Sequence, residues 1–209
     1  MVHSTLVPNM DYAQLASDEQ IERAAEALES HNIHVLIAAS GEEAKSMLFD
    51  IMPEGAEVFT GNSRTLEVLG IPGEVEARYD SVRAKLATMD RKTQWREMVI
   101  LGAVPEYIVG SVHAVTEDGS VVIASMSGSQ LAPYAASAAH VIWIVGAQKI
   151  VRTLDDAMKR VQEYVYPLED EHALQVLGVN SAINKLLVIH KEIIPGRTTM
   201  IIVKEEIGF

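Results

Sequence analysis

Two runs of consecutive apolar residues place the strongest limit on how this chain can fold. Val-Ile-Trp-Ile-Val occupies residues 141–145, and Ile-Ile-Val occupies residues 201–203. A strand without a polar face is stable only when both of its sides are covered, as in a sheet that lies between layers of helices. We therefore expect these two runs to form buried strands of a layered α/β domain.

The segments between these runs have the patterns of amphipathic helices and of further strands. Apolar residues at helical spacing predict helices over residues 17–30, 41–52 and 154–165, and Pro167 is expected to end the third; a weaker pattern covers residues 80–96. Short apolar runs bounded by turn residues predict strands over residues 33–39, 57–60, 112–116, 121–125, 185–190 and 198–204. The turn Glu117-Asp118-Gly119-Ser120 predicts a hairpin, so we expect a mixed sheet.

No repeat or flexible linker divides the chain. The simplest organisation is a single α/β domain over residues 17–209, preceded by an N-terminal arm or tail over residues 1–16. The expected fold is a layered mixed sheet flanked by helices.

Composition removes several classes of function. The chain has 17 Lys and Arg against 29 Asp and Glu, and the formal net charge of −12 disfavours non-specific binding of nucleic acid. It has no cysteine, which excludes disulfides, thiol nucleophiles and protein-ligated iron–sulfur clusters. No signal segment or membrane-spanning run is visible, and no histidine pattern predicts a metal site. We expect a cytoplasmic protein without a membrane partner, and the sequence identifies no cofactor.

One candidate binding loop follows the expected strand over residues 57–60. Gly61 allows a tight turn, Asn62 or Ser63 can cap a short helix, and Arg64 adds a positive charge. With Thr65, these residues could place backbone amides and a guanidinium around a phosphate or carboxylate. The alternative is an ordinary capped helix with an arginine on the surface.

A second candidate loop follows the expected strand over residues 121–125. Its residues are Ser127, Gly128, Ser129 and Gln130, and the small side chains of the first three would let backbone amides approach an anion closely. The loop is not a P-loop, because no Gly-Lys-Ser or Gly-Lys-Thr follows it. The alternative is a loop that binds no ligand.

Glu117, at the start of the hairpin turn, is the candidate catalytic residue. Its carboxyl group could be buried, with a raised pKa, and act as an acid, a base or a nucleophile. The alternative is a solvated turn residue, since acidic side chains are common in turns.

The order of several short motifs resembles that of the LUD-domain family, the lactate-utilisation proteins. The motifs cover residues 61–66, 116–122, 127–130, 141–146 with 149–151, and 196–203 with 206–209. The likeness extends from about Asp18 to Phe209 and implies a fold similar to ribose-5-phosphate isomerase and the coenzyme A transferases. Those relatives bind substrates at loops that follow strands. In the transferases a Glu in a Ser-Glu-Asn-Gly turn is the nucleophile, and Thr116-Glu117-Asp118-Gly119 looks similar.

The resemblance implies a short, cluster-free family member that binds a small anionic metabolite in lactate or related organic-acid utilisation. In this hypothesis the two loops hold the anion and Glu117 faces it. A second hypothesis is a non-catalytic accessory subunit of an iron–sulfur lactate-oxidising complex, since longer relatives carry cysteine motifs that this chain lacks. A third is a sugar-phosphate or acyl-CoA enzyme of the same fold. A homo-oligomer is compatible with each, and none establishes that the chain is an enzyme.

Overall fold

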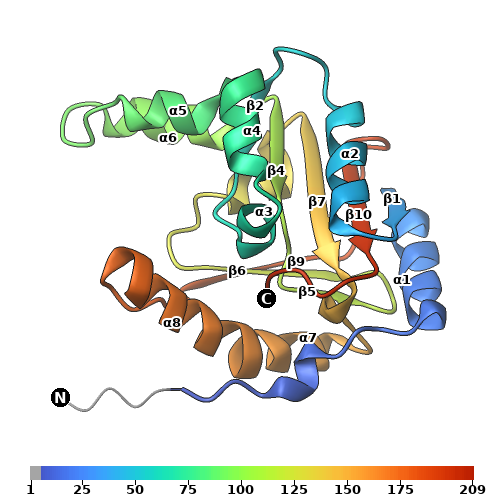
Figure 1. Cartoon of the computed structure of the whole chain (residues 1–209). Coiled ribbons are helices and arrows are strands. Elements are labelled where there is room, and N and C mark those ends of the chain that lie inside the picture. The colour runs from blue at the N-terminus through green and yellow to red at the C-terminus, as the bar shows by residue number, and fades with distance from the viewer. Residues whose placement is uncertain (1–5) are drawn as a thin grey trace.

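The computed structural model describes residues 6–209, which form two β-sheets between layers of helices (Figure 1). Six parallel strands make the larger sheet, in the order β1 (Ile33–Ala38), β10 (Thr198–Val203), β7 (His140–Gly146), β4 (Tyr107–Gly110), β2 (Glu57–Thr60) and β3 (Asp80–Ser81). Four strands make the second, in the order β8 (Ile150–Val151), β5 (Ala114–Thr116), β6 (Val121–Ser125) and β9 (Lys185–Ile189). The layered α/β fold is confirmed, and the antiparallel pairs, including the β5–β6 hairpin, lie in the second sheet.

The α-helices are α1 (Asp18–Ser30), α2 (Gly41–Ile51), α3 (Arg64–Val68), α4 (Ile71–Arg78), α5 (Val82–Ala87), α6 (Trp95–Ala103), α7 (Leu154–Arg160) and α8 (Tyr166–Leu177). Short 3-10 turns cover Met10–Ala13 and Ala147–Lys149, and π-turns cover Pro133–Ser137 and Val161–Val165. The predicted helices over 17–30 and 41–52 are confirmed. The weak helix over 80–96 is wrong, because α5 and α6 are separate helices of an arm that projects from the body (Figure 1).

The surroundings of strand β7 explain why its sequence is apolar throughout. Val141, Trp143 and Val145 belong to the core between the two sheets, which α1 closes. Ile142 and Ile144 point to the opposite face and pack in the core beneath α2, α3 and α4. The outer face of the second sheet is covered in turn by α7 and the π-turn that follows it. Both faces of β7 are therefore buried.

The third predicted helix does not end at Pro167. Helix α7 passes through the π-turn Val161–Val165 into α8, and the Tyr166 amide donates to the carbonyl of Val161. Pro167 is tolerated because it lies in the first turn of α8. The π-turn before it accommodates a residue that has no N–H to donate. The continued helix brings α8 beside the carboxyl ends of the parallel strands.

Residues 6–16 of the expected N-terminal arm run against the α7–α8 layer. The Asn9 amide donates to the carbonyl of Glu163 at 2.9 Å, and the Ala16 amide donates to the carbonyl of Ala147 at 3.4 Å. The first five residues of the arm lie outside the described residues.

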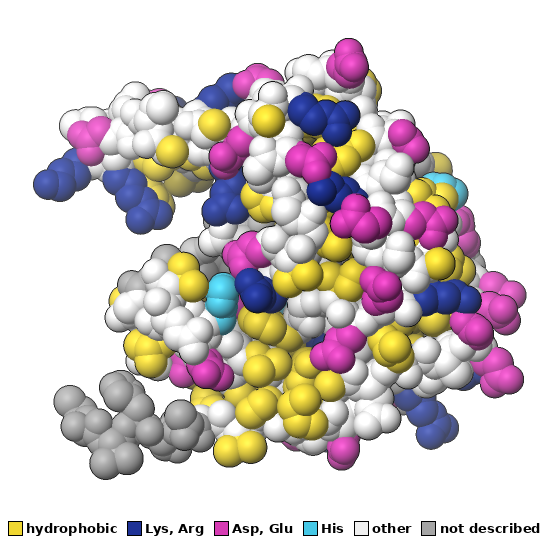
Figure 2. Space-filling model, in the orientation of Figure 1, with side chains coloured by type: hydrophobic (Ala, Val, Ile, Leu, Met, Phe, Trp, Pro, Cys, Tyr) yellow, Lys and Arg dark blue, Asp and Glu magenta, His cyan; other side chains and the backbone are white. Residues whose placement is uncertain are grey.

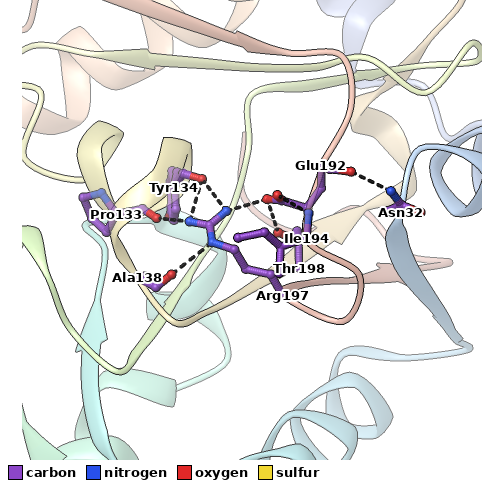
Figure 3. A network of polar contacts seen from close by, with 8 residues as sticks. All are labelled: Asn32, Pro133, Tyr134, Ala138, Glu192, Ile194, Arg197 and Thr198. Atoms are coloured by element: carbon purple, nitrogen blue, oxygen red, sulfur yellow. Dashed lines mark hydrogen bonds and ion pairs between the residues drawn. The ribbon is translucent and has the colours of Figure 1, made fainter.

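A buried ion pair anchors the loop that precedes β10 (Figure 3). Arg197 Nη1 lies 2.5 Å from Glu192 Oε2. The same guanidinium donates to three backbone carbonyls, those of Pro133, Tyr134 and Ala138. Burial opposes ionisation of Glu192, but hydrogen bonds from the Ile194 amide and Arg197 outweigh it and hold the pKa of Glu192 below its ordinary value. The network fixes the π-turn that carries Tyr134.

Candidate functional site

A cleft of about 180 Å³ lies where the carboxyl ends of β2, β4, β6 and β7 meet α8. Strands β2, β4 and β7 are parallel, so the loops that follow them gather at one edge of the sheet, as in other open α/β ligand sites. One wall of the cleft is polar, and the other is formed by side chains such as Val165, Ile183 and Phe209. The face drawn in Figure 2 is hollowed between the α5–α6 arm and α8.

The first predicted loop reaches the cleft with Asn62, Ser63 and Arg64. In the described part of the chain, no hydrogen bond engages the side chains of Asn62 and Ser63, so both are available to a ligand. Arg64 is largely exposed and pairs with Glu67 at 3.3 Å. Because α3 has only five residues, the loop offers side-chain donors rather than the end of a long helix.

Gly61 and Thr65 flank this loop but do not line the cleft. The Gly61 amide donates to the carbonyl of Val109 at 2.8 Å, which extends the sheet. Thr65 is fully buried, and its hydroxyl donates to the carbonyl of Ile207 at 3.2 Å. These two residues support the loop from inside.

The second predicted loop lines the same cleft with Ser127, Ser129 and Gln130. Gly128 has a φ of +88°, a conformation that glycine adopts without strain, and its amide donates to Ser125 Oγ at 2.8 Å. Gln130 Oε1 accepts a hydrogen bond from Ser125 Oγ at 3.0 Å, so this side chain braces the loop. The hydroxyls of Ser127 and Ser129 are exposed, and they donate to Ser129 Oγ at 3.2 Å and to Gln130 Oε1 at 3.4 Å, contacts that a ligand would replace.

Glu117 does not lie in the cleft. Its carboxylate accepts hydrogen bonds from Arg23 Nε at 2.8 Å and Gln20 Nε2 at 2.9 Å, both on α1. These two hydrogen bonds hold the pKa of Glu117 below its ordinary value, in contrast to the raised pKa that the catalytic alternative required. The concavity expected to gather three segments therefore gathers two, and Glu117 joins the hairpin to α1 elsewhere.

Lys149 is a cleft residue that sequence reasoning did not select. Its side chain is 1% exposed, and Nζ donates to Thr65 Oγ1 at 3.0 Å and to Ser111 Oγ at 3.1 Å. Among the residues described, no carboxylate pairs with it. Burial, with a smaller contribution from the nearby Arg160 charge, lowers the pKa of Lys149 well below its ordinary value.

Arg160 lies fully buried beside Lys149. Its Nε donates to the carbonyl of Gln148 at 3.2 Å, and its Nη1 donates to the carbonyl of His113. Nη2 has no hydrogen-bond partner within residues 6–209. Burial lowers the pKa of Arg160 to about 10, so the guanidinium remains charged at neutral pH and adds positive potential behind the cleft.

His113 and Glu169 complete the ionisable lining of the cleft. The Ala124 amide donates to His113 Nδ1 at 3.1 Å, which assigns the ring proton to Nε2. Burial, with smaller contributions from the neighbouring basic groups Lys149 and Arg160, lowers the pKa of His113 to about 3, so the ring is neutral. Burial also raises the pKa of Glu169.

A signal for Lys149 was present in the sequence. A lysine three residues after a buried apolar strand has little chain length in which to reach solvent. Its amino group must therefore find polar partners in the protein interior. His113 and Glu169 gave no comparable signal, since their roles depend on the second sheet and on the helix continuing past Pro167. In the described region, His, Asp and Glu side chains form no cluster of three that could hold a metal ion. None of the helices within residues 6–209 has the length and apolar character of a membrane span.

The fold and the cleft define a layered α/β protein with a polar cleft at the carboxyl edge of its parallel sheet. The model of the LUD domain family matches residues 21–203, so the chain belongs to this family and the resemblance seen in the sequence is confirmed. The structure is similar to the crystal structure of a DUF162 family protein from Deinococcus radiodurans. The TM-score is 0.54, with 11% identity over 91% of this chain and 99% of that one, a likeness that shows the fold alone. A comparison with curated proteins finds no match.

Proposed function

We propose that the cleft binds a small organic acid as its anion, and that the chain serves in the utilisation of lactate or a related acid. The observation that supports this is the composition of the polar wall, where the Arg64 guanidinium and the Lys149 amine lie among hydroxyl and amide groups. The buried charge of Arg160 lies behind this wall. Glu169 is the one acidic side chain among the described lining residues, and burial raises its pKa.

The size of the cleft favours a small ligand. Pockets that enclose drug-sized molecules measure about 300–1,000 Å³, whereas this cleft measures about 180 Å³. A lactate-sized acid has a carboxylate for the polar wall and a short hydrocarbon end for the wall of Val165, Ile183 and Phe209. An acyl-CoA would place only its acyl end inside.

The two loops supply the hydrogen bonds that a carboxylate needs. A carboxylate has about four acceptor sites, and Ser63, Asn62, Ser127 and Ser129 present donors from two sides of the cleft. Neutral His113 can donate through Nε2 to a hydroxyl or carbonyl oxygen of the same ligand. Direct charge-assisted bonds to Arg64 would add affinity.

Thermal unfolding in the presence of lactate, pyruvate, sugar phosphates and CoA esters tests the proposal. A ligand at 100 times its Kd stabilises the fold by about 2.7 kcal/mol. We expect stabilisation by a small organic acid and a reduced effect in the double variant Ser63→Ala and Ser127→Ala. Ser30→Ala, on the exposed end of α1, is the matched control that should keep the effect. Absence of stabilisation by every acid in the wild-type protein would contradict the proposal.

The accessory-subunit hypothesis remains a prediction with a different outcome. Such a subunit would form a stable complex with iron–sulfur partner subunits and would not be stabilised by organic acids. Co-purification from cells and the thermal measurements together separate the two functions.

A further inference from the structure

We infer that Lys149 is a nucleophilic amine that forms a Schiff base with the carbonyl group of a 2-oxo acid bound in the cleft. The inference rests on the proposed function, because the polar loops are what would hold the carboxylate of that acid. It goes further by assigning covalent chemistry to one side chain and by naming the carbonyl as the group that reacts.

Lys149 differs in its hydrogen-bond partners from the lysines that form ion pairs. Lys85 contacts Glu57 at 2.9 Å and Asp80 at 2.5 Å, and Lys204 contacts Asp18 at 2.5 Å. Lys149 contacts two hydroxyls and no carboxylate among the described residues. Hydroxyl groups do not stabilise an ammonium ion as a carboxylate does, so this environment suits the neutral amine.

The hydroxyl of Thr65 fixes the orientation of the amine. Its own proton can go to the carbonyl of Ile207 at 3.2 Å or to Ser111 Oγ at 3.4 Å, and in both cases its oxygen accepts an N–H from Lys149. Ser111 Oγ, 3.1 Å from Nζ, lines the cleft at the end of β4. The amine is thus held by two elements of the sheet edge, at a position that borders the cleft.

Burial and a neighbouring cation are the two features that activate lysine nucleophiles in proteins. Lys149 has both, since it is almost fully buried and lies near the guanidinium of Arg160. The lowered pKa increases the fraction of Lys149 that has a free lone pair on Nζ, in agreement with the hydroxyl contacts.

The reaction balances without an oxidant or reductant. The lone pair of Nζ attacks the carbonyl carbon, one proton moves from nitrogen to the former carbonyl oxygen, and a carbinolamine forms. A second proton from an acid converts the hydroxyl into water, which leaves as the C=N bond of the protonated imine forms. Glu169 lines the same cleft, and its raised pKa makes it the carboxyl group suited to supply that proton.

Reductive trapping of the wild-type protein tests the inference. The protein is incubated with pyruvate and sodium cyanoborohydride, and the reduced adduct is located by intact-mass measurement and peptide mapping. We expect one dominant adduct, on the peptide that contains Lys149, and none when lactate replaces pyruvate, because lactate has no carbonyl carbon. The same result is expected with 2-oxobutyrate.

Two variants serve as controls. Lys149→Arg should lose the adduct, whereas Lys185→Arg should keep it, although Lys185 Nζ donates to the Ser127 carbonyl of the second loop at 2.8 Å. Because the mapping is done on the wild-type chain, the result does not depend on how well a variant folds. No adduct at Lys149 with either oxo acid, or adducts spread evenly over exposed lysines, would overturn the inference.

The outcomes also separate the inference from the proposed function. If organic acids stabilise the fold but Lys149 is not trapped, the acid site stands and the covalent chemistry fails. If no acid stabilises the fold, the proposed function itself fails.

Discussion

Replacing Glu192 by glutamine would test how the buried ion pair supports the cleft. The side chains of Glu192 and Arg197 are 10% and 3% exposed. Glutamine preserves the shape but leaves the Arg197 charge without a counterion. Removing one partner of a buried pair costs about 3–5 kcal/mol, and because three carbonyls still accept from Arg197, we expect about 3 kcal/mol. At about 2–4 °C per kcal/mol for a domain of this size, the Tm should fall by roughly 6–12 °C.

The pH dependence of urea unfolding tests this prediction most directly. The folded pKa of Glu192 lies below the ordinary value of 4.5. The stability it contributes is therefore complete above the unfolded pKa and is lost as the pH falls through the folded pKa. The difference between wild type and Glu192→Gln should be largest at neutral pH and shrink in acid. The double variant with Arg197→Met should recover part of the loss. A neutral-pH loss below about 1 kcal/mol, as for an exposed pair, would refute the reasoning.

Four further predictions concern the cleft and its supports. In Gly110→Ala the new Cβ would lie 1.7 Å from Tyr134 Oη, so Tyr134 must move, and thermal melting should show a loss of about 1–3 kcal/mol. Ser17→Ala removes the capping box of α1 and should cost about 1 kcal/mol in urea unfolding. Lys149→Met should abolish stabilisation by organic acids. The Tm of the free protein should be no lower than that of the wild type, because the substitution removes a buried polar group. Wild-type affinity for an acid should fall as the pH rises through the raised pKa of Glu169, whereas Glu169→Gln should show no such fall in calorimetry.

Local sequence signals predicted the elements, because each depends on residues close in the chain. Ser17 accepts from the Gln20 amide, and the Gln20 side chain accepts from the Ser17 amide, a contact between residues three apart. Strand β7 was identifiable because five apolar residues in succession can satisfy two buried faces. The order of strands was not readable, since β10 inserts between β1 and β7 through pairings between residues far apart in the sequence.

The candidate site also contains residues that local patterns could identify and residues whose surroundings they could not. Asn62, Ser63 and Ser127 could be predicted because loops that follow strands carry binding groups in α/β folds, and all three line the cleft. The expected role of Glu117 depended on what surrounds the hairpin, and α1 lies there with Arg23 in position to pair. Such a contact joins residues 94 apart in the chain, and no local pattern indicates it.

The buried basic groups of this fold are satisfied in two different ways. Arg197 is buried with a carboxylate and three carbonyls, which is how a structural guanidinium is usually satisfied. Lys149 and Arg160 are buried at least as deeply, yet no carboxylate pairs with either among the described residues, and Arg160 Nη2 has no partner there. A buried basic group without a carboxylate destabilises a fold and is found where a site needs its charge or reactivity. The proposed 2-oxo acid would complete this environment, since its carboxylate would balance the Arg160 charge and its carbonyl carbon would meet the neutral amine of Lys149.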